Sequence, residues 1–562
     1  MLRCMLDAIG AMKRNLSQHG GVLAALFGAL MVPMVLGWGP LNPNHVGWML
    51  FGPLGPDTVQ IWLGRGYFEQ TPWLWPPGAN PAWGIELASG IFYTDSIPLL
   101  LFLSKALRGV AQLAQYAGPW MLLCGALHGW LGWRLVALVT EDPLARLAGA
   151  GLLAMQPVWF NRMAGHVHLV AQWVLLAALV LALRPGGGAG RRLAWVGLVT
   201  LTSLLNPYLL VMVAVVWGGD WLRRVAWERG VQAPGAALLE AGAGFGGVLL
   251  ALWCSGFFML RGGFASGSGS EFGTYGSWGL DLLAFFDGGT WSSFLPDLPD
   301  TGHWETGGSY LGLGGVLLVL AGAFACWRRP VVVPWRLWPV VAALGLLLAF
   351  AVTHRVAVAG HVVTLLPLSD QVLAALGALR NSERMAMPVI YALLLMGMAC
   401  CVRAWGGRNT GLLLAALLVV QAVDLRPGVT AVRAMLAPAP DGVPARLQDA
   451  FWPEAAGVYA RVRAVPAGNI GPGWQSIAQF AMQAGLPTDS VYLARVDGAV
   501  VAALRARMAE VLRSGAYEPA TLYVLRDSES VALAQASHDP ARDAIMQVDG
   551  YWVLAPGWLA RR

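Results

Sequence analysis

Two aspartates that flank one long loop have the placement expected of catalytic carboxylates. Asp57 follows the first apolar segment, directly after Gly55 and Pro56, and Asp95 precedes the apolar stretch that begins at Ile97. At a membrane boundary, such a carboxylate can accept a proton from a hydroxyl group or hold a divalent metal ion. Each aspartate also has a plainer interpretation, because aspartate is a common N-terminal cap of helices. We predict that Asp57 is the general base and that Asp95 is the next candidate.

A segment rich in tryptophan and proline lies between these aspartates, with the sequence TPWLWPPG at residues 71–78. Indole rings are favoured at membrane interfaces and pack well against the faces of sugar rings. We therefore predict that Trp73 and Trp75 contact a substrate that the membrane carries.

Two histidines could help to bind a charged group. His166 and His168 lie at the expected outer end of an apolar segment, and their spacing puts them on different faces of a helix. From a turn, both side chains could still point inward, where an imidazole could neutralise a lipid-linked phosphate. The alternative is a purely structural role, which is common for histidines at such a boundary.

Two arginines four residues apart form the strongest candidate for phosphate binding. Arg380 and Arg384 precede an apolar segment, and on a helix their spacing would place both on one face. Arginine binds phosphate oxygens in a bidentate manner, which suits a site at the level of lipid headgroups. The alternatives are interfacial arginines that extend toward water, and an ion pair between Glu383 and one of the two arginines.

The elements that would position these residues are membrane helices. Hydrophobic residues make up 57% of the 562 residues and charged residues only 12%, and the mean hydropathy is +0.58. This composition excludes a soluble globular protein for most of the chain. About eleven segments approach the roughly 20 residues that a helix needs to cross hydrocarbon. They are residues 19–38, 117–139, 145–160, 167–183, 193–205, 207–222, 238–260, 309–326, 337–353, 386–403 and 410–424.

Another apolar stretch, residues 97–107, is shorter than these segments. We expect it to lie in the membrane interface, although it could be a twelfth span.

The placement of arginines predicts the orientation of the spans, because positive residues favour the cytoplasmic side of short loops. Alternation from a cytoplasmic N-terminus puts six positively charged segments inside, from Lys13 and Arg14 to Arg403 and Arg408. An odd number of spans then places the C-terminus outside. The net charge of +6 follows from this asymmetry, so it gives no reason to expect nucleic-acid binding.

The chain is expected to have two domains. A membrane domain would cover residues 1–424 and carry two external loops, 39–116 and 261–308, the second rich in glycine, serine and aromatic residues. A small α/β domain would cover residues 425–562 on the periplasmic side. The fold class is therefore an all-α membrane bundle of about 11 transmembrane helices with a C-terminal α/β domain.

The C-terminal domain contains both strand and helix patterns. Residues 490–495, 522–525 and 551–554 are typical of strands, and residues 500–514 have helical spacing of apolar side chains. Because no nucleophile or metal cluster occurs in it, we favour a packing or acceptor-orienting role. The six cysteines of the chain suggest neither a disulfide nor a zinc site.

Five motifs, in order along the chain, resemble a bacterial membrane family known only as a domain of unknown function, DUF6311. They are residues 71–78, 94–98, 165–166, 309–314, and 380–384 with Pro388. The likeness covers essentially the whole chain. The family is similar in layout to the GT-C glycosyltransferases, which use polyprenyl-phosphate sugars and an acidic residue in the first external loop. By that layout Asp57 matches the catalytic position. The family pattern at the arginines is Arg-Ala-Ser-Gly-Arg, from which Asn381 and Glu383 depart.

The resemblance implies a GT-C-type glycosyltransferase in the bacterial inner membrane. Such an enzyme would move a sugar from a polyprenyl-phosphate donor to a cell-envelope glycan or lipid acceptor at the periplasmic face. No cofactor is required by this interpretation, although a divalent metal could take part. One alternative is a transporter or flippase for lipid-linked saccharides, which should show ionisable residues and helix breaks, such as Asn206-Pro207, within its spans. A third is a non-catalytic polysaccharide assembly protein that lacks the acid.

Overall fold

The computed structural model describes residues 2–50, 54–110, 113–227, 234–260, 275–301, 308–437, 447–469, 473–493 and 495–561, with side chains from residue 18 onward. These residues form two compact units. Unit 1 comprises Met1–His45, Ala114–Leu249 and Gly273–Ala439, and unit 2 comprises Val46–Leu113, Leu250–Phe272 and Pro440–Arg562. Much of the predicted second external loop, residues 261–274 and 302–307, lies outside the described residues.

Unit 1 is a bundle of helices. Their bounds are α1 Leu2–Leu36, α5 Ala117–Val136, α6 Pro143–Ala154, α7 Pro157–Met163, α8 Trp173–Leu183, α9 Ala189–Ser203, α10 Pro207–Trp227, α11 Pro234–Cys254, α12 Gly312–Arg328, α13 Trp338–Val352, α14 Asp370–Leu376, α15 Met387–Asp424 and α16 Arg426–Leu436, and the last turn of α11 belongs to unit 2. A hairpin of β1 (Arg355–Val358) and β2 (His361–Thr364) accompanies them.

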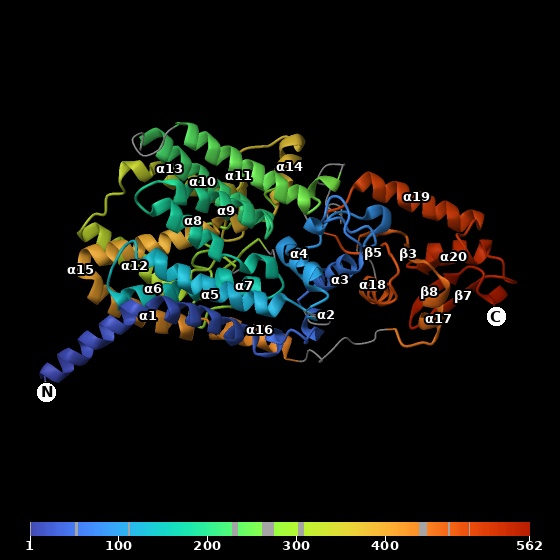
Figure 1. Ribbon diagram of the computed structural model, residues 1–562, viewed down its shortest axis with the longest axis horizontal. Helices are drawn as coiled ribbons and strands as arrows, with labels where there is room; N and C mark the ends of the chain where they lie inside the picture. Colours follow the sequence, from blue (N-terminus) through green and yellow to red (C-terminus); the bar gives the residue numbers. More distant parts are fainter. Residues whose placement is uncertain are drawn as a thin grey trace. The chain divides into compact units, whose positions relative to one another are not determined.

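Small residues allow the helices of unit 1 to approach closely. α12 packs along α15 and α1 packs along α5 (Figure 1). A Cβ atom added at Gly28 of α1 would lie 2.1 Å from the carbonyl oxygen of Gly125 on α5, and one at Gly129 would lie 1.9 Å from that of Ala24. Side-chain volume at these positions would therefore separate the two helices, as expected for small residues at membrane helix contacts.

The number of membrane-crossing helices predicted from sequence is not confirmed. Among the described residues, four helical segments are long and apolar enough to cross: Gln18–Leu36, Pro234–Cys254, Trp335–Val352 and Ser382–Asp424. They make the chain a membrane protein by length and composition. Several other predicted spans are shorter helices. The 12 residues of α6, for instance, cover only about 18 Å, against a hydrocarbon core of about 30 Å.

Two of the predicted spans, 386–403 and 410–424, lie within the single element α15. Gly406 interrupts this helix with φ 79° and ψ 163°, which is not a helical conformation. The stretch 97–107 forms helix α4 (Pro98–Leu107), whose 10 residues are too short to cross the hydrocarbon core.

Unit 2 combines helices with a small mixed sheet. Its elements are α2 Gly47–Leu50, α3 Pro56–Gln70, α4 Pro98–Leu107, α17 Phe451–Val458, β3 Arg461–Val465, β4 Gly468–Asn469, α18 Trp474–Gln483, β5 Ser490–Val491, α19 Gly498–Ser514, β6 Thr521–Leu525, α20 Ser528–Ser537, β7 Ala544–Val548 and β8 Tyr551–Ala555. The main sheet has the order β3-β6-β8-β7, in which β3 and β6 are parallel and the other neighbours are antiparallel.

The sequence patterns located most of the C-terminal elements. The predicted strands 522–525 and 551–554 correspond to β6 and β8, and the predicted helix 500–514 corresponds to α19. The predicted strand 490–495 is shorter, because β5 covers only Ser490 and Val491, and residue 494 lies outside the described residues.

The compact units cut across the domain boundary that we expected at residue 424. Residues 46–113, from the first external loop, group with the C-terminal residues in unit 2, whereas α16 groups with the helical bundle. The reason is visible in the backbone contacts. Gly84 N donates to Thr488 O over 2.8 Å, and Thr488 N donates to Ala82 O over 3.0 Å. The loop thus adds a short extended segment beside the C-terminal domain.

Candidate functional site

Asp57 lies in the first turn of α3 in unit 2. The N-cap is Gly55, with φ 80°, and Pro56 occupies the first helical position. Glycine adopts this positive φ without steric cost, so the sharp entry into α3 depends on it. Asp57 is half-buried and is not the N-cap residue of α3. Its carboxylate is favoured at this end of the helix by the helix dipole.

Asp95 has a strained backbone in the same unit. Its φ is 49°, in the left-handed region that few residues other than glycine adopt. Ile97 is the N-cap of α4 and Pro98 follows it, so Asp95 does not cap this helix either. Strain of this kind is often retained at sites that bind or react. On each side of Asp95, Thr94 and Ser96 are buried, and Thr94 Oγ1 donates to Ser96 Oγ over 3.0 Å.

The two predicted tryptophans differ in their surroundings. Trp75 is 80% exposed, and its ring centroid lies 5.5 Å from that of Trp253. Trp73 is 55% exposed and stacks on Phe102 with a centroid distance of 6.3 Å. The other neighbour of Trp73 is an ammonium group, because Lys105 Nζ lies 4.6 Å from the centre of the indole. Trp75 is therefore the more accessible platform for a ligand.

Lys105 is enclosed by aromatic rings, a feature that the sequence did not reveal to us. Its Nζ lies 3.9 Å from the centre of the Phe68 ring and donates to Pro72 O over 3.3 Å. The residue is 8% exposed, and this burial lowers its pKa to about 8. The aromatic rings and the Pro72 carbonyl group stabilise the positive charge of the Lys105 ammonium group. Through these contacts Lys105 anchors the Trp/Pro segment to α4.

Three of the four predicted phosphate-binding residues lie close together in unit 1. Arg384 Nη2 lies 3.2 Å from His166 Nε2, and the Arg384 guanidinium lies 5.0 Å from the centre of the Tyr208 ring. Because arginine only donates hydrogen bonds, Nε2 of His166 is the acceptor and the imidazole is neutral. The ring of His168 lies 6.1 Å from that of His166, edge to face. We call Arg384, His166, His168 and Tyr208 the Arg384 cluster.

Three elements position the Arg384 cluster. His166 follows α7 and the left-handed Gly165, whose φ is 110°. Tyr208 lies in the first turn of α10, where Asn206 Oδ1 accepts from the Tyr208 amide over 2.8 Å, so the predicted helix break at Asn206 is a helix cap. Arg384 lies on a short 3₁₀ helix that leads into α15. Arg384 and His168 are buried, whereas His166 is half-buried.

The predicted helical relationship between Arg380 and Arg384 is wrong. Arg380 ends one short 3₁₀ helix, and Asn381, with φ −80° and ψ 68°, separates it from the next one. The i, i+4 spacing therefore does not put both guanidinium groups on one helix face. Asn381 N donates to the hydroxyl of Tyr208 over 3.2 Å, which ties this break to the Arg384 cluster.

Glu383, one of the two departures from the family pattern, is buried and accepts a hydrogen bond from Ser309 Oγ over 2.7 Å. Its backbone amide donates to Trp278 O over 3.0 Å. Both contacts fix the segment that carries Arg384.

The eight predicted site residues thus fall into two groups. Asp57, Asp95, Trp73 and Trp75 belong to unit 2, and His166, His168, Arg380 and Arg384 belong to unit 1. Of these, a side-chain contact joins Arg384 to His166 and a ring contact joins His166 to His168.

An ion-pair network holds the first external loop to the C-terminal sheet within unit 2. Arg463 on β3 is 1% exposed and donates to Glu86 over 2.7 and 2.8 Å and to Asp489 over 3.0 Å. Arg507 on α19 also donates to Glu86. Burial alone would raise the pKa of Glu86, but the hydrogen bonds from Arg463 and Arg507 lower it to about 2. Local sequence patterns cannot reveal such a contact, because Glu86 and Arg463 are 377 positions apart.

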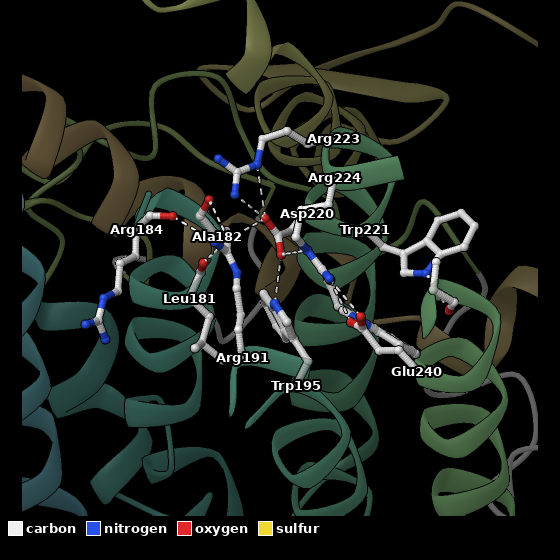
Figure 2. Close-up of polar contacts among 12 residues, drawn as sticks. Leu181, Ala182, Arg184, Arg191, Trp195, Asp220, Trp221, Arg223, Arg224 and Glu240 are labelled. Atoms are coloured by element: carbon white, nitrogen blue, oxygen red, sulfur yellow. Dashed lines mark hydrogen bonds and ion pairs between the residues drawn. The ribbon is translucent and has the colours of Figure 1, made fainter. Parts of the chain in front are cut away.

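A second network lies inside unit 1, among helices whose sequence looks apolar (Figure 2). The fully buried Asp220 on α10 accepts from Arg191, Arg223 and Arg224 over 2.6, 2.8 and 2.9 Å. The indole of Trp195 also donates to Asp220, over 2.8 Å.

Arg224 extends this network to α11. It donates to Glu240 over 2.6 and 2.7 Å, and the indole of Trp217 donates to the same carboxylate over 2.8 Å. A charged residue within an apolar helix is the signal that could have found this network, because such residues persist only when paired or functional.

Three acidic side chains of unit 1 come close enough together to hold a cation. The candidate ligand atoms of Asp287, Asp297 and Asp300 all lie within 4.8 Å of one another. Asp287 is buried and accepts from the amides of Gly289 and Leu298 over 3.1 and 3.0 Å. Burial, together with the charges of the other two carboxylates, raises the pKa of Asp297. Carboxylate oxygens are the ligands that Ca²⁺ and Mg²⁺ prefer.

Comparison with protein families gives two adjacent matches. The profile of the domain of unknown function DUF6311 matches residues 25–426, and the profile of the DUF6311 C-terminal domain matches residues 451–556. The chain belongs to the DUF6311 family. All eight predicted site residues lie within the first match, and the second match spans the sheet of unit 2.

Comparison with solved structures relates this DUF6311 protein to oligosaccharyltransferases of Archaeoglobus fulgidus. One, tethered to an acceptor peptide, has 12% identity and a TM-score of 0.42, and the match covers 85% of this chain and 65% of that chain. Another, named AglB, is bound to an inhibitory peptide and a dolichol-phosphate. It has 12% identity and a TM-score of 0.42, and the match covers 84% of this chain and 64% of that chain. The DUF6311 chain therefore spans just under two thirds of the length of these proteins. A search of curated proteins found no match.

Proposed function

We propose that this DUF6311 protein is an integral membrane glycosyltransferase that moves a sugar from a polyprenyl-phosphate donor to a cell-envelope acceptor. The observation that carries the proposal is the contact of 3.2 Å between Arg384 and His166. A buried guanidinium paired with a neutral imidazole can reorganise around a phosphate, since both side chains can donate to its oxygens. The two residues also come from distant parts of the chain, so tertiary packing maintains their contact.

The position of Arg384 fits a donor with a lipid tail. The segment Ser382–Asp424, which begins two residues before Arg384, has the longest apolar sequence of the four candidate spans. A polyprenyl chain would lie in the hydrocarbon layer beside such a helix, and its phosphate would lie at the helix end. Arg384 would stabilise the phosphate as it leaves, with His166 beside it.

Asp57 is the proposed general base. It would accept the proton of the acceptor hydroxyl as the hydroxyl oxygen attacks the anomeric carbon and the bond from that carbon to the phosphate oxygen breaks. Asp57 is half-buried in the first turn of α3, directly after the sharp entry at Gly55 and Pro56. Asp95 is the alternative base, and its left-handed backbone at the same loop supports that choice.

The proposal also covers the two substrates and the place of the protein in the cell envelope. The donor is a lipid-linked sugar, and the acceptor is a glycan or lipid of the cell envelope. The protein would lie in the bacterial inner membrane with its N-terminus in the cytoplasm and its C-terminus in the periplasm. Reporter fusions after Asp424 test this orientation: activity of a periplasmic phosphatase reporter supports it, and activity of a cytoplasmic reporter there contradicts it.

A divalent metal, where the reaction uses one, would bind carboxylates such as those of Asp287, Asp297 and Asp300.

The direct experiment is a transfer assay on the purified full-length protein. Its components are a polyprenyl-phosphate sugar with a radioactive sugar and a cell-envelope fraction as acceptor. Transfer of label that requires the protein supports the proposal. Movement of the intact donor across a vesicle membrane without transfer would instead indicate a flippase.

The flippase alternative has one observation in its favour, the buried charges of Asp220 and Glu240 within α10 and α11. Transporters carry such groups along the substrate path. Here Arg224 donates to Asp220 over 2.9 Å and to Glu240 over 2.6 Å, which is more typical of a fixed ion-pair contact between helices. A non-catalytic assembly protein would show neither transfer nor movement.

A further inference from the structure

We propose that the C-terminal domain holds a saccharide-binding pocket at one end of its main sheet, with the indole of Trp552 as the platform for a sugar ring. The pocket has a volume of about 620 Å³. This lies within the range of roughly 300–1,000 Å³ that is typical of ligand sites. Its lining comes from the end of β6, the start of α20, the turn between β7 and β8, and the start of β8.

Trp552 differs from the other tryptophans of this domain. Trp452, Trp474 and Trp558 are buried, with 1%, 2% and 5% exposure, and pack against other aromatic rings. Trp552 is only half-buried and lines the pocket. Its strand neighbours are Leu525 on β6 and Gln547 on β7. An indole that is held by strands on both sides and open to a cavity is a rigid surface for an apolar face of a ligand.

The rim of the pocket is fixed by a tight turn. Asp549 and Gly550 have φ values of 47° and 84°, which are the two positive values of a type I′ hairpin turn. The Asp549 carboxylate accepts from the amides of Gln448 and Asp449 over 2.6 and 3.0 Å and from the indole of Trp452 over 3.1 Å. These contacts hold the turn in place before any ligand arrives, which reduces the entropy lost on binding.

Tyr551, which directly follows the turn as the first residue of β8, is fixed in a similar way. A Cβ atom added at Gly473 would lie 2.4 Å from the Tyr551 ring, so only glycine leaves room for the ring there. The Tyr551 hydroxyl donates to Gly473 O over 3.4 Å. The aromatic residues of the pocket are therefore positioned by contacts that exist without a ligand.

The polar side chains of the pocket identify the class of ligand. Arg526, Asp527 and Gln535 line the same pocket as Trp552 and supply planar donors and acceptors. Sugars combine an apolar ring face with hydroxyl groups that both donate and accept, and this mixture suits them. Asp527 and Asp549 both line the pocket, which disfavours a ligand rich in phosphate because like charges repel.

The assignment of a saccharide rests on the proposed function, in which the acceptor is a cell-envelope glycan. The pocket would bind a sugar unit of that acceptor away from the reacting hydroxyl. Binding energy from such a remote unit can orient the acceptor for attack.

Saturation-transfer NMR on the full-length protein in nanodiscs tests the pocket without any donor. The probes are the methyl glycosides of glucose, galactose, mannose, rhamnose and N-acetylglucosamine. We expect saturation to reach the ring protons of at least one probe. The Trp552→Ala substitution should weaken binding of that probe roughly tenfold, the loss expected for one aromatic contact. Gln535→Ala, at an exposed position on α20, should also weaken it with less risk to folding.

The matched control is Trp327→Ala, since Trp327 is 78% exposed and belongs to unit 1. Binding in this variant should equal that of the unmodified protein. The proposal is overturned if none of the probes receives saturation, or if both Trp552→Ala and Gln535→Ala bind as well as the control. Binding that depends on Trp552 in a protein without transfer activity would contradict the proposed function and leave the pocket intact. Transfer activity without glycoside binding would contradict the saccharide pocket and leave the proposed function intact.

Discussion

Arg384 and His166 are 218 positions apart in the sequence, yet Arg384 Nη2 lies 3.2 Å from His166 Nε2. The Tyr208 ring supports the same guanidinium at 5.0 Å, and the Tyr208 hydroxyl accepts from Asn381 N. The packing of α7, α10 and the segment before α15 therefore fixes a cation next to a neutral imidazole. We expect this pair to recognise the phosphate of the donor.

Arg384→Ala should weaken use of the donor. Hydrogen bonds to a charged group contribute about 1.5–3 kcal/mol, so we expect the donor KM to rise roughly 10- to 100-fold. The kcat should change little if the contact is equal in the ground and transition states. Steady-state transfer assays over a range of donor concentrations measure both values. Arg329→Ala, at an exposed position, is the control, and an unchanged donor KM in Arg384→Ala would contradict the assignment.

Glu86→Gln should loosen the contact between the first external loop and the C-terminal sheet. Glu86 is partly exposed, so we expect a loss of about 1–2 kcal/mol in the stability of unit 2 at pH 7. Thermal unfolding of the purified protein measures this loss. Glu510→Gln removes an exposed ion pair with Arg513 and should have a much smaller effect.

The effect of Glu86 should also depend on pH. The folded-state pKa of about 2 is lower than the ordinary value of 4.5. The unfolded state therefore binds more protons between these values, and the stabilisation is present above pH 4.5 and lost as the pH falls toward 2. The difference in unfolding temperature between Glu86→Gln and the unmodified protein should shrink over this window. A difference that stays constant between pH 7 and pH 3 would contradict this role of the carboxylate.

Lys105 should titrate well below an ordinary lysine. The sequence contains only one other lysine, Lys13, so labelling with [¹³Cε]lysine gives two side-chain signals. We expect Lys105 to titrate near pH 8 because burial lowers its pKa, which is well below the roughly 10.4 of an unperturbed lysine. Trp73→Ala should admit water and move the Lys105 pKa upward. A Lys105 signal that titrates like an unperturbed lysine in the unmodified protein would contradict the aromatic enclosure.

The lowered pKa of Lys105 has a consequence for stability. The unfolded state binds more protons than the folded state between pH 8 and 10.5, so the contribution of Lys105 to stability rises with pH across that window.

Asp220→Asn should destabilise unit 1. The substitution leaves Arg191, Arg223 and Arg224 buried without their shared carboxylate, and breaking a buried ion pair costs roughly 3–5 kcal/mol. Thermal unfolding in detergent should show a lower midpoint, whereas Glu141→Gln at an exposed position should not. Normal stability combined with loss of donor movement across vesicles would instead place Asp220 on a transport path.

The sequence predicted local structure better than it predicted contacts between distant residues. β6, β8 and α19 follow from alternation and helical spacing that lie within the elements themselves. The number of membrane spans could not be predicted in this way, because helices of 11 or 12 residues, such as α8 and α6, also have apolar sequences.

In the candidate site too, the sequence indicated which residues matter better than it indicated their contacts. Residue types singled out Arg384 and His166, which the structure brings into contact, and their role in phosphate binding stays a prediction. The spacing of Arg380 and Arg384 was misleading, because Asn381 breaks the helix between them. The ion pair between Glu86 and Arg463 depends on the packing of residues 377 positions apart, and no local pattern encodes it.

The central claim is that Asp57 accepts a proton during sugar transfer, and Asp57→Asn tests it most directly. Asparagine keeps the size and hydrogen bonding of the side chain but cannot act as the base, and Gly55 rather than Asp57 caps α3, so the protein should still fold. The measurement is the rate of transfer from a polyprenyl-phosphate sugar by purified Asp57→Asn, with its unfolding temperature as the control. We expect the rate to fall by roughly 10² to 10⁴ at an unchanged unfolding temperature. Full activity in Asp57→Asn would contradict the account and transfer the role to Asp95.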